Sequence, residues 1–375
     1  MNDKVFQHFA LSSDDPRWSD WKWQYAHRIT DVKTLSDTIT LSDAEEQAIE
    51  RCLDDFRMAI TPYFASLIDP DDLACPIRQQ VVPSISETDY SPDESDDPLD
   101  EEAHSPTESL VHRYPDRVLF LVTRHCASYC RFCIRKRHVG EEDFVISPTE
   151  IDRAIKYIRE HPAIRDVLIS GGDPLTLVDD DIENIIARIR AIDHVEIIRI
   201  GTRVPAFLPM RIDDKLLSML RKYHPLYINA HFNHAAELTE EARRACTAIV
   251  DAGIPLGNQS VLLRGVNDNS AIMRDLMLKL VQTRVRPYYL YQCDLCKGCS
   301  HFRTSVQTGI EIIRNLTGNI SGLAVPQYVI DAPQGGGKIP INPEYLLSID
   351  DQQVEMLNFE GQLYNYPQPT SAGSI

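Results

Sequence analysis

The feature that most constrains this chain is a short loop that carries three cysteines. Cys126, Cys130 and Cys133 follow the spacing C-x3-C-x2-C, and an apolar run at 118–123 leads directly into them. Three thiolates on one tight loop can hold three irons of a [4Fe–4S] cube. The fourth iron then lacks a protein ligand, so a small molecule can chelate it and receive one electron directly from the cluster.

Two other interpretations of this loop stay open at this stage. A zinc ion would need a fourth ligand, for which His125 or His138 can be proposed. Three cysteines can also be buried together by chance, since a free thiol packs like a small apolar group. Basic residues occupy much of 131–137, and we expect them to offset the negative charge of a cluster and its thiolates.

The length and composition are typical of a globular protein without a nucleic-acid or membrane partner. With 375 residues, the chain is long enough for one large domain or for two or three ordinary ones. Its formal net charge of −18 argues against nucleic acid, and no apolar run approaches the roughly 20 residues of a membrane span. The nine cysteines form no secretory framework, and the polar N-terminus has no signal pattern. We therefore expect a cytoplasmic protein in a reducing environment.

The first third of the chain changes character once. Residues 1–75 show helical spacing, and Ser42 is a suitable cap for the helix that follows it. Residues 84–107, in contrast, are acidic and contain prolines. By composition, 84–107 is a solvated linker or arm.

From residue 111 onward, apolar strand-like runs alternate with helical segments. The runs lie at 118–123, 165–170, 195–201, 226–232, 255–263 and 286–292. Six such units, with strands that are buried on both faces, predict a parallel α/β sheet that is either open or curled into a barrel.

Unusual polar residues and glycines lie in these runs or directly after them, most of them near the carboxyl ends of the predicted strands. They are Gly171, Gly172, Asp173, Thr202, Arg203, His231, Asn233, Asn258, Gln259, Ser260 and Asp294. In parallel α/β barrels, that rim binds ligands. The two glycines let the backbone approach a ligand closely, and the carboxylate of Asp173 can receive an ammonium group. Taken singly, each residue also has a structural explanation, such as a helix cap at Asp173.

A second cofactor candidate lies at 324–338. A strand-like run ends at Asp331, and three consecutive glycines then precede Lys338. A lysine on a flexible glycine arm suits an imine with an aldehyde cofactor. The alternative is a surface loop with a solvated lysine, and the spacing does not match a phosphate-binding P-loop.

These motifs resemble the lysine 2,3-aminomutase family of radical S-adenosylmethionine enzymes over nearly the whole chain. The matching segments are Trp18-Ser-Asp-Trp-Lys-Trp-Gln, Met58-Ala-Ile-Thr-Pro-Tyr, His112-Arg-Tyr-Pro-Asp-Arg117, the cysteine loop, Ser170-Gly-Gly-Asp, His231-Phe-Asn-His, Arg286-Pro-Tyr-Tyr, Tyr291-Gln-Cys-Asp, His301-Phe-Arg-Thr and Asp331-Ala-Pro-Gln-Gly-Gly-Gly-Lys338. The resemblance implies an α/β fold with a partial (β/α)6 radical-SAM barrel over 111–330. A helical region with the acidic linker would precede it over 1–110, and a C-terminal segment with the cofactor lysine would follow it over 331–375.

The resemblance also implies three cofactors and the residues that hold them. Cys126, Cys130 and Cys133 would ligate a [4Fe–4S] cluster, and S-adenosylmethionine would chelate its open iron. The residues that would hold S-adenosylmethionine are Gly171, Gly172, Asp173, Arg203, His231 and Gln259. Lys338 would bond to pyridoxal 5′-phosphate, and Arg113 would bind the phosphate of that cofactor.

The implied reaction moves the α-amino group of an amino acid to its β-carbon by radical chemistry. Arg135 would pair with the substrate α-carboxylate, and Asp294 and Asp331 would receive a distal ammonium group. Two acids that face one cation fit L-lysine and argue against a glutamate side chain. A guanidinium would also satisfy them, so an L-arginine enzyme stays open, as does a short-form enzyme that makes β-lysine for a translation factor. The alternative from a different class is a non-catalytic iron–sulfur or zinc-binding protein.

Implied partners are an electron donor of the flavodoxin or ferredoxin type and further copies of the chain, in a dimer or tetramer. The chain departs from the longer lysine enzymes, because it lacks their cysteine-bearing tail and has Asn269 in place of a zinc cysteine. We therefore expect no structural zinc. The run with Cys293, Cys296 and Cys299 leaves a second metal site open, although free thiols are favoured. Gln334 replaces a glycine that is usual before the cofactor lysine.

Overall fold

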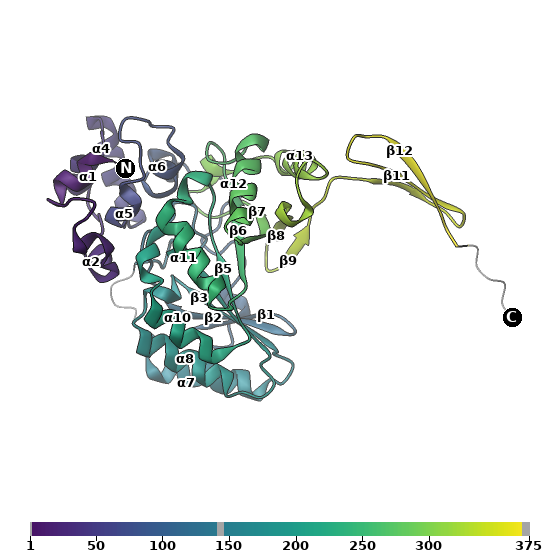
Figure 1. Cartoon of the computed structure of the whole chain (residues 1–375), viewed down its shortest axis with the longest axis horizontal. Helices are drawn as coiled ribbons and strands as arrows, with labels where there is room; N and C mark the ends of the chain where they lie inside the picture. The colour runs from purple at the N-terminus through teal and green to yellow at the C-terminus, as the bar shows by residue number, and fades with distance from the viewer. Residues whose placement is uncertain (1, 141–145, 370–375) are drawn as a thin grey trace.

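The computed structural model describes residues 2–140 and 146–369. Figure 1 shows short helices at the N-terminal end, a curved sheet flanked by helices, and a small C-terminal sheet that projects away from the body. Residue 1 and residues 370–375, which belong to the expected segments 1–110 and 331–375, lie outside the described residues.

Short helices make up the N-terminal part, as the sequence predicts for 1–75. They are α1 (Asp3–His8), α2 (Trp21–Ala26), α3 (Val32–Thr38), α4 (Asp43–Asp55), α5 (Pro62–Ala65) and α6 (Pro76–Val81). Ser42 caps α4, because its hydroxyl accepts from the backbone N–H of Glu45 while the Glu45 carboxylate accepts from the N–H of Ser42. This reciprocal cap confirms the predicted helix start at Ser42.

The body is a nine-stranded sheet whose strands follow chain order from β1 to β9. They are β1 (Leu110–Tyr114), β2 (Arg117–Thr123), β3 (Asp166–Gly171), β4 (Ile197–Thr202), β5 (Leu226–Ala230), β6 (Leu256–Leu262), β7 (Arg286–Gln292), β8 (Gln327–Ala332) and β9 (Gly337–Pro340). Strands β2 to β8 pair in parallel, and β1 and β9 are antiparallel edges. The backbone N–H of Lys338 in β9 donates to the hydroxyl of Tyr114 in β1 over 2.9 Å, so the two edges meet. The sheet is therefore a nearly closed barrel, which confirms the expected fold class.

Helices cover the outside of this barrel (Figure 1). They are α7 (Pro148–Glu160), α8 (Asp179–Arg190), α9 (Val204–Phe207), α10 (Asp214–Leu220), α11 (Glu240–Asp251), α12 (Ser270–Gln282) and α13 (Val306–Leu316). In β4, Ile198 and Ile200 are fully buried, whereas Arg199 between them lines an interior cavity. Since successive side chains of a strand point to opposite faces, one face packs on helices and the other faces the barrel interior. Asn269 caps α12 by accepting from the N–H of Ala271 at 2.8 Å.

Lys338 belongs to the barrel sheet itself. The expected boundary after residue 330 falls inside β8, and β9 pairs with β8 so that Asp331 lies opposite Lys338. The cofactor lysine is therefore held by strand pairing and not by a free loop.

Residues 84–107, which we call the acidic arm, pack against the cysteine loop. Glu87 is fully buried, and its two carboxylate oxygens accept from Nε and Nη2 of Arg131 at 2.8 and 2.7 Å. Lys136 Nζ lies 3.4 Å from the same carboxylate. The expectation of a solvated segment was therefore wrong here, because the basic residues of the loop supply the counter-charges that let Glu87 be buried.

Two further basic side chains of the loop also bind the acidic arm. Arg135 pairs with Glu101 through two hydrogen bonds, and Nη2 of Arg137 lies 3.6 Å from Asp97 and 3.0 Å from Glu102. We expected these basic residues to offset the charge of a cluster. That expectation stays a prediction, and the structure adds that these side chains also pair with carboxylates of the arm.

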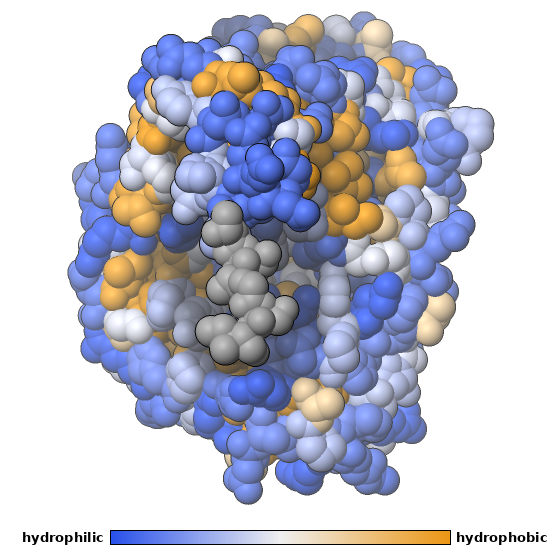
Figure 2. All heavy atoms as spheres, turned by 90° about the vertical axis from the view of Figure 1, so that its right-hand side faces the viewer, coloured by the Kyte–Doolittle hydropathy of each residue, from blue (hydrophilic) through white to orange (hydrophobic). Residues whose placement is uncertain are grey.

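The C-terminal sheet contains β10 (Leu346–Ile349), β11 (Gln353–Leu357) and β12 (Leu363–Pro367) in antiparallel order. It stands away from the barrel in Figure 1, and its apolar side chains are largely exposed. Figure 2 views the molecule from this side and shows apolar patches on the surface. Among the described residues, no helix is long and apolar enough to cross a membrane.

The buried pair between the acidic arm and the cysteine loop makes a testable contribution to stability. We expect Glu87→Ala to lower the free energy of unfolding by about 3–5 kcal/mol, because Arg131 and Lys136 would remain buried without their carboxylate. Denaturant unfolding followed by circular dichroism measures this loss. Asp152→Ala is the matched control, since Asp152 is 67% exposed in its pair with Arg188 and should cost less than about 1 kcal/mol. Equal losses in the two variants would contradict the assignment.

Candidate active site

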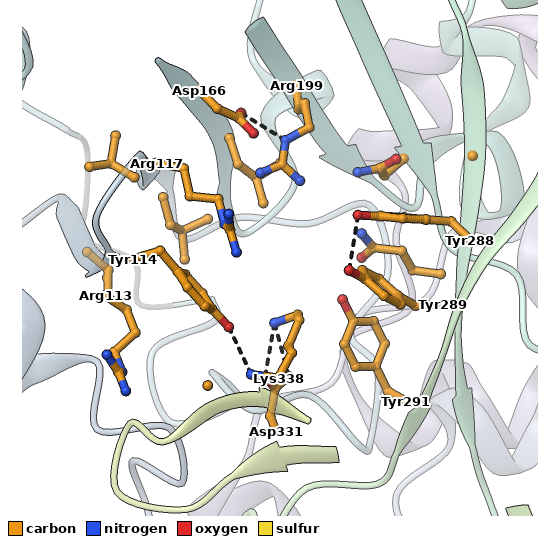
Figure 3. A pocket seen from close by; sticks show the side chains of 18 of the residues that line it. Arg113, Tyr114, Arg117, Asp166, Arg199, Tyr288, Tyr289, Tyr291, Asp331 and Lys338 are labelled. Carbon is orange, nitrogen blue, oxygen red and sulfur yellow. Dashed lines mark hydrogen bonds and ion pairs between the residues drawn. The ribbon is translucent and has the colours of Figure 1, made fainter. Parts of the chain in front are cut away.

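A cavity of about 630 Å³ lies inside the barrel and is lined by strands β1 to β9 together with the acidic arm. Figure 3 shows its side chains. Lys338 enters from β9, Tyr289 and Tyr291 from β7, and Arg117 and Arg199 from β2 and β4. This volume lies within the range of 300–1,000 Å³ that is typical of small-molecule sites.

The cysteine loop begins directly after β2, where the apolar run 118–123 ends. Cys126, Cys130 and Cys133 are free, partly exposed thiols on this loop. Burial raises the pKa of all three thiols, in the case of Cys133 to about 11. Nη1 of Arg203 donates to Sγ of Cys130 at 2.9 Å, so a guanidinium is in place to stabilise a thiolate there.

The arrangement of these thiols fits a cluster better than a single metal ion. Zinc needs four ligands around one point, whereas a cube distributes its three cysteine ligands over three irons. The loop therefore supports the predicted [4Fe–4S] site.

The glycine turn after β3 packs tightly against the cysteine loop. Gly171 has a φ of +121°, and a Cβ atom on Gly172 would lie 2.2 Å from the carbonyl oxygen of His125. The N–H of Asp173 donates to that same carbonyl at 2.7 Å. The glycines are thus required by the contact between the two loops, which adds a structural reason to the close ligand approach that the sequence predicts.

The Asp173 carboxylate connects the ends of β3 and β4. It accepts from the hydroxyl of Thr202 at 2.8 Å and from the backbone N–H of Arg203 at 2.6 Å. Burial raises the pKa of Asp173, and the hydrogen bonds from Arg203 and Thr202 counteract this. The hydroxyl of Thr202 and the N–H of Arg203 already bind this carboxylate. Its predicted contact with an ammonium group of a ligand stays a prediction.

Arg203 lies at the centre of a buried polar network beneath the cysteine loop. Its Nη2 donates to Gln80 and, at 3.0 Å, to Glu237, and its Nε donates to the carbonyl of His231 at 3.3 Å. Sequence reasoning identified Arg203 and His231 but missed Gln80 and Glu237. Both lie in ordinary helical segments, so no local signal distinguishes them.

His231 directly follows β5, and Gln259 lies in the neighbouring strand β6. Nε2 of His231 lies 3.0 Å from Oδ1 of Asn233. Burial, and then the positive charge of Arg203, lower the pKa of His231 to about 3, so its imidazole is neutral near pH 7. Gln259 in β6 lines the cavity. His231 and Gln259 thus offer hydrogen-bonding groups near the cysteine loop and the cavity. Their contacts with S-adenosylmethionine stay predictions.

Two carboxylates gather around Lys338. Nζ of Lys338 lies 3.0 Å from Oδ1 and 3.2 Å from Oδ2 of Asp331 (Figure 3). Burial, and then the charge of Asp331, raise the pKa of Asp294 to about 7, while Lys338 lowers it. Asp331 thus contacts Lys338 and Asp294 lies near both, while the role of the two acids toward a substrate stays a prediction.

Arg135, the predicted partner of a substrate carboxylate, holds Glu101 in this structure. Nε of Arg135 donates to Oε2 of Glu101 at 2.8 Å, and Nη2 donates to Oε1. No local pattern in the sequence predicts this contact, because the two residues are 34 positions apart.

Arginines inside the barrel suit the phosphate of pyridoxal phosphate. Arg113, the predicted phosphate ligand, lines the cavity, but so do Arg117 and Arg199. In Figure 3, Arg117 and Arg199 point toward the middle of the cavity, opposite Lys338, whereas the guanidinium of Arg113 is directed away. Sequence reasoning missed this pair. The signal was a charged residue at an alternating position of an otherwise apolar strand, as at Arg199.

The second cysteine run packs beneath the cluster loop. Cys293, Cys296 and Cys299 are buried in an apolar cluster that includes Phe132. The thiol of Cys296 donates to the backbone carbonyl of Cys133 at 3.2 Å. The three thiols therefore act here as packing groups that support the loop.

Comparisons with known proteins agree with this site. Residues 120–276 match the family model for the radical SAM superfamily, and residues 313–374 match the C-terminal model described as lysine-2,3-aminomutase. An L-lysine 2,3-aminomutase from Acetoanaerobium sticklandii is 52% identical over 98% of this chain and 88% of its own length. One from Clostridium subterminale is also 52% identical, over 95% and 85%. A glutamate 2,3-aminomutase from Clostridioides difficile is 46% identical, over 94% and 83%.

The matches extend over the barrel, the cysteine loop and the lysine strand, so the likeness includes every part of the site described above. The chain belongs to the lysine 2,3-aminomutase family of radical S-adenosylmethionine enzymes, which are isomerases that use a [4Fe–4S] cluster, S-adenosylmethionine and pyridoxal 5′-phosphate.

Proposed function

We propose that this chain is a 2,3-aminomutase that moves the α-amino group of a cationic L-amino acid, in the first place L-lysine, to the β-carbon. The observation that carries this proposal is the pair of carboxylates near Lys338: Asp331 lines the cavity and contacts Lys338, and Asp294 lies close enough for the charges of both to shift its pKa. A distal ammonium group can neutralise two acids that would otherwise be buried close together.

The same two acids oppose an anionic side chain. A glutamate substrate would place its own carboxylate beside Asp294 and Asp331, where like charges repel. Two relatives named as lysine enzymes are 52% identical to this chain, and the relative named as a glutamate enzyme is 46% identical. L-Arginine satisfies two acids as well, so it is the second candidate substrate.

The chain's own residues would bind and orient the reactants. Lys338 would hold the aldehyde carbon of pyridoxal phosphate, and Arg117 and Arg199 its phosphate, because all three face one cavity. When bound, the cluster and S-adenosylmethionine supply a hydrogen-abstracting radical, and pyridoxal phosphate carries the migrating nitrogen. Arg135 would hold the α-carboxylate, and the barrel wall would exclude water from the reacting atoms.

The cluster end of the site would be held by the cysteine loop and the rim. Cys126, Cys130 and Cys133 would bind three irons, with Arg203 donating to the sulfur of Cys130. The neutral imidazole of His231 and the amide of Gln259 would contact S-adenosylmethionine. We also propose that the reduced electron carrier is a flavodoxin or ferredoxin in a reducing cytoplasm, since a partly exposed cluster loop suits both.

Anaerobic reconstitution followed by an amino-acid panel tests the reaction directly. We expect β-lysine as the main product by mass spectrometry, and L-arginine and L-glutamate serve as the competing substrates. In the double variant Asp294→Asn, Asp331→Asn, lysine turnover should fall at least about a hundred-fold, because two charge-assisted contacts of about 1.5–3 kcal/mol each are lost. Uncoupled cleavage of S-adenosylmethionine should persist there, whereas Cys126→Ser should abolish it. Full lysine turnover in the double variant would refute the substrate assignment.

The raised pKa of Asp294 predicts a pH dependence for substrate affinity. With a pKa of about 7, the Asp294 carboxyl is protonated below this pH and ionises as the pH rises through it. The KM for L-lysine should therefore fall by about ten-fold between pH 6 and pH 8, which follows from the ionised fraction of one such group. In Asp294→Asn, KM should be higher and should lose this dependence. An unchanged pH profile in the variant would show that another group is responsible.

We propose further that the C-terminal sheet binds a second copy of the chain. Ile349 lies opposite Val354, and Val354 opposite Tyr366, so the three form one row across β10, β11 and β12. Ile349 is 63% exposed and Tyr366 62%. An apolar face on a projecting sheet is typical of an interaction surface, and further copies of the chain are the partner that the family resemblance implies.

Light scattering after size-exclusion chromatography tests this association. We expect the wild-type mass to be a multiple of 42.6 kDa, and the double variant Ile349→Lys, Tyr366→Lys to dissociate. Val178→Lys replaces a side chain that is 50% exposed on the barrel, and it should leave the mass unchanged. A wild-type mass of one chain would overturn the proposal.

A further inference from the structure

Glu101 binds the guanidinium of Arg135, which the proposed reaction assigns to the α-carboxylate of the substrate. Arg135 donates from Nε and Nη2 to the two carboxylate oxygens of Glu101. The side chains are only 19% and 13% exposed, so water screens this pair weakly. The contact is bidentate, which is the geometry in which a guanidinium also recognises an α-carboxylate.

The acidic arm brings Glu101 into the wall of the cavity. Leu99 and Glu101 both line it, in the same space as Asp331 and Lys338. The charges of Glu101 and Arg135 both affect the Asp294 carboxyl, the first raising and the second lowering its pKa. Glu101 therefore lies near Asp294, which would bind the distal cation of the substrate. It also contacts Arg135, which would bind the α-carboxylate of the substrate.

The backbone at Glu101 is held independently of its side chain. Its carbonyl accepts from the backbone N–H of His104 at 3.1 Å and from the hydroxyl of Ser105 at 2.7 Å. Rotation of the side chain alone can therefore release Arg135 while the arm stays in place. A second carboxylate cannot use the same two N–H groups at the same time, since each donates one linear hydrogen bond.

We propose that Glu101 is a specificity-determining residue that substitutes for the substrate α-carboxylate on Arg135 and is displaced when an amino acid binds. Before binding, Glu101 holds the guanidinium in the orientation that the substrate needs. An amino acid with a free α-carboxylate exchanges for it, whereas a derivative without this carboxylate leaves Glu101 in place. The inference rests on the proposed function, because it assumes that Arg135 receives the substrate.

The variant Glu101→Gln tests this competition in the holoenzyme. Calorimetric titration without reductant and without S-adenosylmethionine measures binding in the absence of turnover. We expect L-lysine to bind about ten-fold more tightly to Glu101→Gln than to the wild type, because a neutral amide competes less well for a guanidinium. L-Lysinamide, which has no carboxylate, should bind both proteins equally. In turnover assays, KM for L-lysine should fall while kcat changes little.

Glu102→Gln is the matched control in the same segment. Glu102 pairs with Arg137 at 3.0 Å, is 76% exposed, and does not line the cavity. It should leave the affinity for L-lysine and KM unchanged. If Glu101→Gln binds L-lysine no more tightly than the wild type, or strengthens L-lysinamide equally, the competition does not exist and the inference is overturned.

A wild-type structure with pyridoxal phosphate and L-lysine bound keeps the inference testable even if Glu101→Gln does not fold. We expect Arg135 to contact the α-carboxylate and Glu101 to have turned away. Both hydrogen bonds from Arg135 to Glu101 persisting in that complex would overturn the inference, although lysine turnover would still stand. If the wild type neither binds nor converts any cationic amino acid, the proposed function fails first and the inference fails with it.

Discussion

The cysteine loop carries four basic side chains within seven residues, and each of them contacts a carboxylate of the acidic arm. The most buried of these contacts joins Glu87 to Arg131 and Lys136. A buried charge without a partner is costly, so the loop can lie against the barrel only when the arm lies there too. Glu94 extends the contact by accepting from the backbone N–H groups that follow Lys297. These ion pairs thus place the iron-binding loop, the arm and the second cysteine run as one unit.

The same principle applies inside the cavity, where several charges already have partners within the protein. Lys338 pairs with Asp331 and Arg199 with Asp166, and Glu101, which lines the cavity, pairs with Arg135 behind it. A ligand that contacts these paired groups exchanges one ion pair for another. Such exchange favours ligands whose charges match the partners they displace, and it rejects those that would leave a buried charge alone. Substrate choice in this family member is therefore a matter of charge balance as well as shape.

Much of the fold could be predicted because its signals are local. The apolar runs are interrupted by turn and helix signals, so the parallel strands followed from periodicity, whereas their order in the sheet did not. The spacing of Cys126, Cys130 and Cys133 favoured a cluster but left zinc open, and the resemblance to the family then implied the cluster. The prediction that 84–107 is solvated was wrong because its partner is distant in sequence. An acidic composition indicates solvation only when no basic surface elsewhere in the fold pairs with it. The position of Arg117 and Arg199 in the cavity was missed. An alternating strand pattern shows that a strand has two faces, but it does not show which face lines a cavity.

The sequence by itself determined the element types, the cysteine loop and the presence of a lysine suited to an aldehyde cofactor. These features depend on residues that are close neighbours along the chain. Only the tertiary structure decided which charges meet, as in the contact between Glu87 and Arg131 across 44 positions. It also decided that Glu101 reaches the arginine predicted to bind substrate. Electrostatic interactions depend on separation in space and on burial, and neither quantity exists until the strands have brought distant segments together.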